Sequence, residues 1–181
     1  MPASERVQSL IEQIFSYAEA GVFAIIDGAS APGLLQSIYQ FEPQYCCLYR
    51  GALEPDLAEV APYLVHLEPD SPFTQGLLEQ GWGKHWGIFV LAEVDLRVLR
   101  QHFRKFLMVH DESGKPLYFR YYDPRVLRAY LPTCNETELR LVFGPVSRYY
   151  LEAEDPALLI EFCQQQGKLS QTVVELAKSK P

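Results

Sequence analysis

The sequence lacks the segments that carry a chain to or across a membrane. No part of the 181-residue chain forms an apolar run close to the ~20 residues that a membrane-spanning helix needs. The N-terminal residues MPASERVQSL contain no basic region that leads into a long apolar stretch, so no signal peptide is predicted. We therefore expect a cytoplasmic protein with no membrane partner.

Positive charge is also scarce. Lysine and arginine together number 16 against 23 acidic residues, which gives a formal net charge of -7. A chain that binds nucleic acid without sequence preference needs a net or strongly clustered positive surface, so we expect no nucleic-acid partner. The acidic surface serves mainly to keep the protein soluble.

Signatures of catalysis and of metal binding are missing as well. The chain contains no GxSxG, GxxxxGK[ST], GxGxxG or HExxH pattern. Its four cysteines show no CxxC spacing, and its four histidines lack the spacing of metal ligands. The sequence therefore predicts no catalytic residue, no metal and no cofactor.

Apolar and aromatic residues, by contrast, are abundant. They make up 48% and 13% of the chain, which is typical of a folded domain. Helical spacing of apolar residues alternates with short apolar runs, and this alternation predicts an α/β domain with a mixed central sheet flanked by helices. The helices are expected at 4–20, 32–40, 71–81 and 95–106, and the strands at 22–26, 45–49, 63–67 and 88–91. Ser71 and Asp95 are expected to cap two of these helices, and Asn135 is expected to cap a further short helix through Leu139.

We place this α/β domain at residues 1–148 and a C-terminal helical extension at residues 149–181. In the extension, Asp155 followed by Pro156 matches the start of a helix. Thr172 and Glu175 have the spacing of a capping box, which predicts a last short helix.

The stretch LYFRYYDPRVLRAYL, residues 117–131, holds the first candidate site. Residues 117–122 suggest a strand that pairs with residues 107–109 in a hairpin, and Asp123 then caps a helix that begins at Pro124. Arg120 inside an apolar strand needs a partner, which could be Asp123, or it could hold a neighbouring loop. Alternatively Arg120, Asp123 and Arg125 form a polar cluster at a strand end that binds a ligand.

Two further groups are candidates for partner binding. Trp82 and Trp86 lie in a glycine-broken loop, and such tryptophans are either core anchors or interface hot spots. Arg97, Arg100 and Arg104 are spaced by three and four residues along the helix expected after Asp95. This basic stripe is either an ordinary solvated helix face or a docking surface for an acidic partner.

The order of several segments resembles a known bacterial family, "domain of unknown function 4123". The segments are FAIIDGA, LYRG, APYLVHL, GWGKHWGIFV, LRQHFRKFLMV, YFRYYDPRVLRAYLP and FGPV, and they extend from Val22 to Val146. The most specific of them is FRYYDPRVL. The residues that match the family pattern are Asp27, Gly51, Pro62, Tyr63, Trp82, Gly83, Arg120, Asp123, Pro124 and Arg125.

That family contains adaptor chaperones of the type VI secretion system. The resemblance implies a non-catalytic cytoplasmic protein that binds a secreted toxin effector and helps to load it onto a VgrG or PAAR spike protein. On this interpretation the aromatic loop with Trp82 and Trp86 and the apolar side of the C-terminal helices contact the client, and the basic stripe steers an acidic client. The cluster of Arg120, Asp123 and Arg125 is a further candidate for partner contact. The competing interpretation is a small-molecule-binding protein or hydrolase that uses the polar cluster at Arg120, Asp123 and Arg125.

Overall fold

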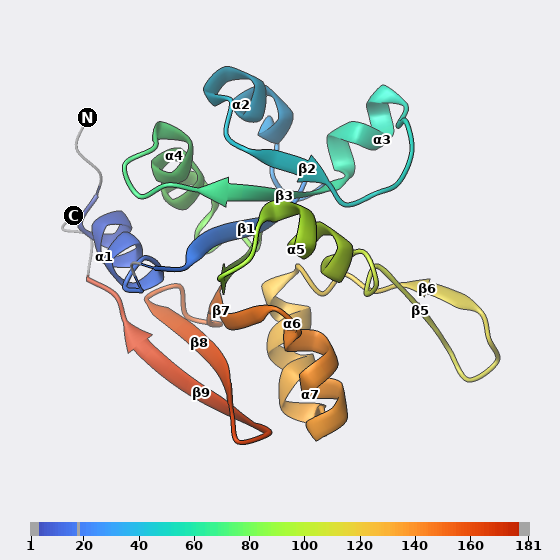
Figure 1. Ribbon diagram of the computed structural model, residues 1–181. Helices are drawn as coiled ribbons and strands as arrows, with labels where there is room; N and C mark the ends of the chain where they lie inside the picture. Colours follow the sequence, from blue (N-terminus) through green and yellow to red (C-terminus); the bar gives the residue numbers. More distant parts are fainter. Residues whose placement is uncertain (1–3, 18, 178–181) are drawn as a thin grey trace.

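A seven-stranded sheet separates two layers of helices in the computed structural model, which describes residues 4–17 and 19–177 (Figure 1). Across the sheet the strands are β2 (Tyr45–Cys47), β3 (Pro62–Leu67), β1 (Gly21–Asp27), β4 (Gly87–Ala92), β7 (Val146–Glu152), β8 (Leu158–Gln165) and β9 (Lys168–Glu175). Each neighbouring pair is antiparallel. The predicted α/β class and central sheet are confirmed, but the described pairings are antiparallel where a mixed sheet was expected.

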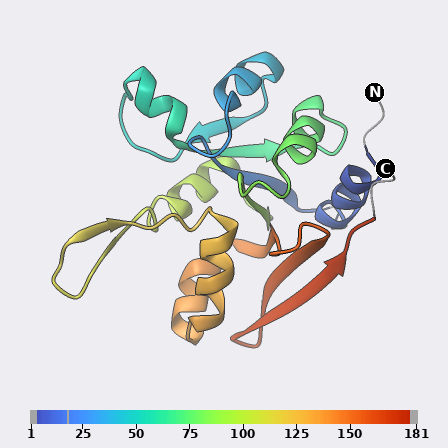
Figure 2. The same cartoon turned by 180° about the vertical axis from the view of Figure 1, so that it is seen from behind.

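The helices cover both faces of this sheet (Figures 1 and 2). One layer contains α1 (Glu5–Ile14), α2 (Leu34–Phe41) and α4 (Pro72–Gly81). The other contains α5 (Leu96–Phe103), α6 (Pro124–Tyr130), the short 3₁₀ helix η1 (Leu131–Thr133) and α7 (Glu136–Phe143). The short helix α3 (Pro55–Val60) precedes β3 and has no buried residue.

Strand β1 shows why the central strands are apolar on both sides. Val22, Ala24 and Ile26 belong to the core beneath α1, α2 and α4, whereas Phe23 and Ile25 belong to the core beneath the other helices. Successive side chains of a strand point to opposite faces, so a strand that is covered on both faces needs a continuous apolar run. The run at 22–26 predicts this arrangement, and the structure confirms it.

The predicted helix starts are confirmed at several positions. Ser71, Asp95, Asp123 and Asn135 each accept a hydrogen bond from a backbone N–H in the first turn of the helix that follows. These side chains satisfy donors that a helix leaves unpaired at its N-terminus. Helix α1 begins after Ser4 and ends at Ile14, well before the predicted end at residue 20, and residue 18 of that prediction lies outside the described residues.

The predicted C-terminal helices are wrong. Residues 158–165 and 168–175 form β8 and β9, and the predicted boundary between 148 and 149 falls inside β7. Asp155 accepts the N–H of Ala157 at 2.8 Å in the turn between β7 and β8, so it caps no helix. Thr172 and Glu175 lie within β9. Residues 178–181 of the predicted extension lie outside the described residues.

The last strand also contacts the first helix. Leu176 is buried in the same core as α1, and its N–H donates to the carbonyl oxygen of Ala157 at 2.8 Å. The N–H of Ala177 donates to the hydroxyl of Ser9 at 3.3 Å, across a separation of 168 residues. In the described part of the chain, the residues that follow β9 therefore pack against α1.

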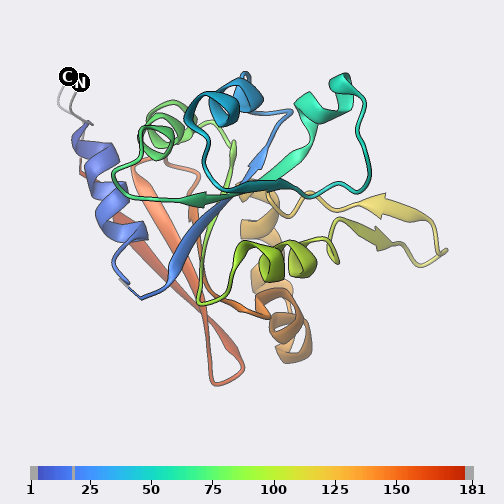
Figure 3. The same cartoon turned by 45° about the horizontal axis from the view of Figure 1, so that its top comes forward.

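The predicted hairpin after α5 is confirmed, although its second strand is shorter than expected. Strand β5 (Met108–His110) pairs with β6 (Pro116–Tyr118) in a separate two-stranded sheet. The hairpin projects from the body on the side where α3 lies (Figures 1 and 3). Because β6 ends at Tyr118, Arg120 lies in the connection to α6 and not inside a strand.

Candidate functional site

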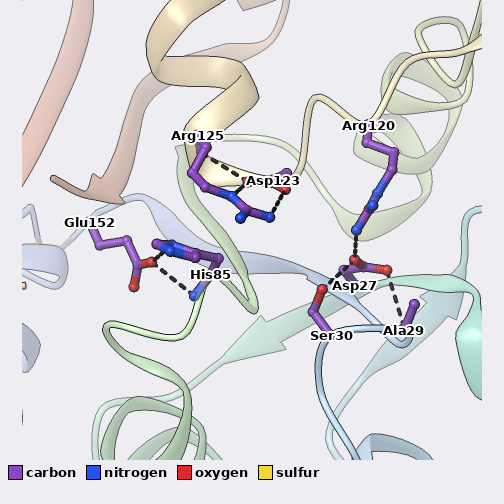
Figure 4. Close-up of polar contacts among 8 residues, drawn as sticks. All are labelled: Asp27, Ala29, Ser30, His85, Arg120, Asp123, Arg125 and Glu152. Atoms are coloured by element: carbon purple, nitrogen blue, oxygen red, sulfur yellow. Dashed lines mark hydrogen bonds and ion pairs between the residues drawn. The ribbon is translucent and has the colours of Figure 1, made fainter. Parts of the chain in front are cut away.

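A buried carboxylate at the end of β1 is the partner of Arg120. Asp27 is only 2% exposed and accepts the N–H of Ala29 at 3.2 Å and the hydroxyl of Ser30 at 2.7 Å. The oxygen that accepts the Ser30 hydroxyl, Oδ2, also forms an ion pair with Arg120 (Figure 4). A buried carboxylate needs hydrogen bonds and an opposite charge to offset its loss of hydration. The pair therefore attaches the segment after the β5–β6 hairpin to the central sheet.

The glycine that follows Asp27 is required by a close approach of two backbones. A Cβ atom at Gly28 would lie 2.5 Å from the carbonyl oxygen of Glu59 and 2.6 Å from that of Ala61. The N–H of Gly28 donates to the Ala61 oxygen at 3.0 Å. Asp27 and Gly28 thus combine, in the turn after β1, a buried carboxylate and a backbone contact with the residues that precede β3.

Asp123 has a different arginine as its partner. Its carboxylate accepts from Arg125 Nε at 3.0 Å, from Arg125 Nη2 at 2.7 Å and from the Arg125 backbone N–H at 2.9 Å. Burial raises the pKa of Asp123, but the hydrogen bonds and the charge of Arg125 outweigh burial and lower the pKa overall. Asp123 therefore stays ionised at neutral pH and supports the start of α6.

The structure divides the predicted cluster of Arg120, Asp123 and Arg125 into two ion pairs. Arg120 pairs with Asp27, so the expected alternative of an Arg120–Asp123 pair is wrong. Both carboxylates are engaged by arginine and by backbone N–H groups (Figure 4). This geometry gives the cluster a positioning role, because neither carboxylate is left without a donor.

A second buried carboxylate, Glu152 at the end of β7, holds the aromatic loop. It is 3% exposed, accepts the N–H of His85 at 2.8 Å and accepts the N–H of Gly83. Its carboxylate also contacts the His85 ring (Figure 4). His85 has a φ of 61°, a left-handed conformation that is uncommon for residues other than glycine. Glu152 therefore stabilises a strained turn between the two tryptophans, and no local sequence pattern identifies it.

Both tryptophans of that loop pack against the body of the protein. The indole Nε1 of Trp82 donates to the carbonyl oxygen of Pro156 at 2.8 Å, and its ring lies 6.2 Å from that of Phe89. Trp86 packs so closely on Gly81 that a Cβ atom there would lie 2.7 Å from the indole. The two side chains are half-buried at the edge of the core beneath α4.

The three arginines of the predicted basic stripe have different surroundings. Arg97 is exposed, whereas Arg100 is half-buried and its Nε has no hydrogen-bond partner among the described residues. Arg104 donates to three successive carbonyl oxygens, those of Cys47 at the end of β2 and of Leu48 and Tyr49 after it, at 3.1, 3.0 and 2.7 Å. Burial, followed by the charges of Arg100 and Arg50, lowers the pKa of the Arg104 guanidinium. Arg50, Arg100 and Arg104 thus form a local positive cluster.

An open apolar groove adjoins this cluster. Its volume is about 510 Å³, and it lies between the β5–β6 hairpin, the end of α5 and the segment that carries α3. Its lining consists of Leu48, Tyr49, Arg50, Leu53, Leu57, Arg104, Leu107, Met108 and Tyr118. Large side chains remain in contact with solvent here, with Tyr118 70% exposed, Met108 45% and Leu57 44%.

Sequence reasoning missed this groove. Its lining comes from a loop, a short helix, a helix end and a hairpin, so no periodic pattern in one segment predicts it. The available signal was that Met108, Val109, Leu117 and Tyr118 are consecutive apolar residues on both faces of a short hairpin, and these two faces cannot both be covered. Exposed apolar surface of this kind typically marks an interaction site.

The remaining candidate chemistry is sparse within residues 4–17 and 19–177. No group of three or more His, Cys, Asp or Glu side chains in this part of the chain is placed to hold a metal ion. Burial raises the pKa of the Cys46 thiol to about 11, so this cysteine is protonated at neutral pH. None of the described helices combines the length and the apolar character that crossing a bilayer requires.

The fold and the site define an α/β protein in which the buried Asp27 holds the segment after the β5–β6 hairpin, and this hairpin borders an open apolar groove. The model of one family, "Domain of unknown function (DUF4123)", matches residues 22–141, which is more than half of the chain. The protein therefore belongs to the DUF4123 family. No curated protein and no solved structure matches the chain.

Proposed function

We propose that this protein is a cytoplasmic adaptor chaperone that binds a type VI secretion toxin effector and helps to load it onto a VgrG or PAAR spike protein. It would do so without catalysis. The observation that carries the proposal is the open apolar groove beside the projecting hairpin, in a chain that belongs to the DUF4123 family.

The physical requirement for a chaperone is a surface that can cover an apolar segment of its client. A hairpin whose paired residues are all exposed, together with an adjoining apolar groove, supplies such a surface. The half-buried Trp82 and Trp86 present less free surface than the groove does. The exposed Arg97 and the cluster of Arg100 and Arg104 lie on α5 or at its end, where they would attract an acidic client.

The alternative of a small-molecule-binding protein or hydrolase has weaker support. Asp27 and Asp123 are both held by arginine, and the lowered pKa of Asp123 makes it a poor proton donor at neutral pH. The groove is lined mainly by apolar side chains and its acid–base groups are arginines and tyrosines. These features suit association with a polypeptide better than acid–base chemistry.

The test is a pull-down of the tagged protein from its native bacterium, followed by mass spectrometry, with the tag alone as the control. We expect one large toxin-like protein together with a VgrG or PAAR protein. Deletion of the gene for this protein should then abolish secretion of that toxin while secretion of the spike protein continues. The proposal fails if neither partner is recovered and a small molecule is found bound to the purified protein.

A further inference from the structure

We infer that the groove binds one amphipathic segment whose apolar side chains contact Leu57, Met108 and Tyr118 and whose acidic residues meet Arg50 and Arg104. That the segment belongs to a toxin effector rests on the proposed function. The chemistry of the segment rests on the groove alone.

The apolar part of the inference comes from size and exposure. A volume of about 510 Å³ lies within the roughly 300–1,000 Å³ that pockets for compact ligands occupy. Tyr118 contacts Tyr49 across the groove, with ring centroids 6.3 Å apart, yet 70% of Tyr118 faces solvent. Leu57 and Met108 are similarly half-covered. A partner that inserts large apolar side chains here would remove this surface from water.

The acidic part of the inference comes from charge. The whole chain has a net charge of -7, but the charged residues that line the groove are Arg50 and Arg104. Within the described part of the chain neither of them, nor Arg100, forms an ion pair with a carboxylate. The burial of Arg100 Nε without an acceptor adds to the unmatched positive charge beside the groove. A partner that carries carboxylates would complement this cluster.

The orientation of the segment follows from the position of the charges along the hairpin. Arg104 lies at the base of the hairpin, where it donates to carbonyl oxygens at the end of β2 and just after it. The hairpin turn, at the end that projects farthest from the body, carries Asp111 and Glu112 against Lys115 and is therefore net negative (Figure 3). The acidic end of the segment should therefore lie toward the body, and the end near the turn should be neutral or basic.

The experiment is a selection from a displayed library of random 20-residue peptides on the purified full-length protein. Enriched peptides are then titrated by fluorescence anisotropy against the wild type, Tyr118→Asp and Arg50→Glu. Matched controls are Leu141→Asp and Arg140→Glu, which change an exposed apolar residue and an exposed arginine of α7, outside the groove.

We expect the enriched peptides to combine large apolar residues with acidic residues at one end. Tyr118→Asp should weaken their binding about tenfold or more, as expected for loss of a central aromatic contact. Arg50→Glu should weaken binding at low salt and less at high salt, because ions screen exposed charges. Both controls should change affinity less than about twofold, and all four variants should show the circular dichroism spectrum of the wild type.

The inference is overturned if no peptide is enriched, if enriched peptides lack acidic residues, or if they bind Tyr118→Asp as well as the wild type. Its failure can be distinguished from failure of the proposed function. An effector that is recovered with the spike protein but binds Tyr118→Asp and Arg50→Glu normally would leave the adaptor function intact and refute the groove. If acidic amphipathic peptides are enriched but the pull-down recovers no effector, the result would support peptide binding in the groove and refute the adaptor function.

Discussion

Two antiparallel hairpins of this protein have opposite relations to the core. The β8–β9 hairpin pairs along eight residues in each strand and joins the main sheet through β7. The β5–β6 hairpin pairs along three residues in each strand, all six of which are exposed. Two segments with the same local geometry therefore serve different purposes, since one completes the core and the other presents apolar side chains to solvent.

The attachment of the two hairpins differs in the same way. Ile160 and Phe162 of β8 enter the core beneath α5, α6 and α7, while Leu159 enters the opposite core. Arg120 lies two residues after the end of the β5–β6 hairpin, and its ion pair with Asp27 links this segment to the central sheet. Apolar burial therefore anchors the β8–β9 hairpin, whereas an ion pair with a buried carboxylate positions the β5–β6 hairpin.

The largest effect should follow from Phe162→Ala. This side chain is fully buried, and removing it leaves a cavity between β8 and the helices above it. We expect a loss of about 3–5 kcal/mol in the free energy of unfolding, measured by urea denaturation. Val173→Ala on the exposed face of β9 is the matched control, and it should cost within about 0.5 kcal/mol. Equal losses in the two variants would contradict a core role for β8.

An intermediate effect is expected for Arg120→Ala. The change leaves the buried Asp27 carboxylate without its ionic partner, which should cost about 1–3 kcal/mol. Hydrogen exchange should also accelerate at the base of the hairpin, for example at Phe119, whose N–H donates to the Leu107 carbonyl oxygen at 3.1 Å. Arg125→Ala breaks the other ion pair and should leave this exchange unchanged. Unaltered exchange in Arg120→Ala would show that the ion pair does not attach the hairpin.

The smallest effect concerns pH and reports on the core alone. His102 on α5 is buried, and its Nε2 lies 2.9 Å from the carbonyl oxygen of Val142 on α7. Burial, with a smaller contribution from Lys105, lowers the pKa of His102 despite the opposing effect of that hydrogen bond. The unfolded chain, with a histidine pKa of about 6.5, therefore binds more protons than the folded protein as the pH falls below that value.

The stability that neutral His102 contributes is thus present above about pH 6.5 and declines as the pH falls toward the lowered pKa of the folded state. We expect the wild type to lose more stability than His102→Gln between pH 7.5 and pH 5.5, in urea denaturation at each pH. Peptide binding by the groove, measured on the wild type over the same range, should change little while the protein stays folded. A difference between wild type and variant that is independent of pH would contradict this account.

Local signals in the sequence predicted the fold well where one segment carries the whole signal. The caps at Ser71, Asp95, Asp123 and Asn135 need only a polar side chain at the start of a helix, and the structure contains each of them. The apolar run at 22–26 likewise predicted a strand that is covered on both faces. These features depend on neighbours within a few residues.

The C-terminal strands were missed because their cover comes from distant segments. Leu158, Leu159 and Phe162 have a spacing that fits a helix as well as a strand. Tertiary contacts determine that this segment forms a strand. Its backbone pairs with β7, and its side chains pack in the cores beneath both layers of helices. No pattern inside residues 149–181 contains that information.

The candidate site shows the same limit. The sequence indicated that Arg120 needs a partner, but the partner lies 93 residues away, so the nearby Asp123 was as reasonable a candidate as Asp27. The groove unites Leu57 with Met108 and Tyr118, which belong to separate elements. The sequence shows which residues need a partner. Which residues actually meet depends on the topology of the sheet, and the sequence does not show that.

The contact between α1 and the end of β9 bears on how the protein is made. Ser9 and Ala177 meet across 168 residues, and Leu176 fills part of the core beneath α1. During synthesis α1 leaves the ribosome long before β9, so the apolar face of α1 stays uncovered until the end of the chain has been made. Contacts so far apart in the chain also raise the contact order, which slows folding. The newly made chain would thus pass through a period in which the apolar face of α1 is exposed, before Leu176 and the end of β9 cover it.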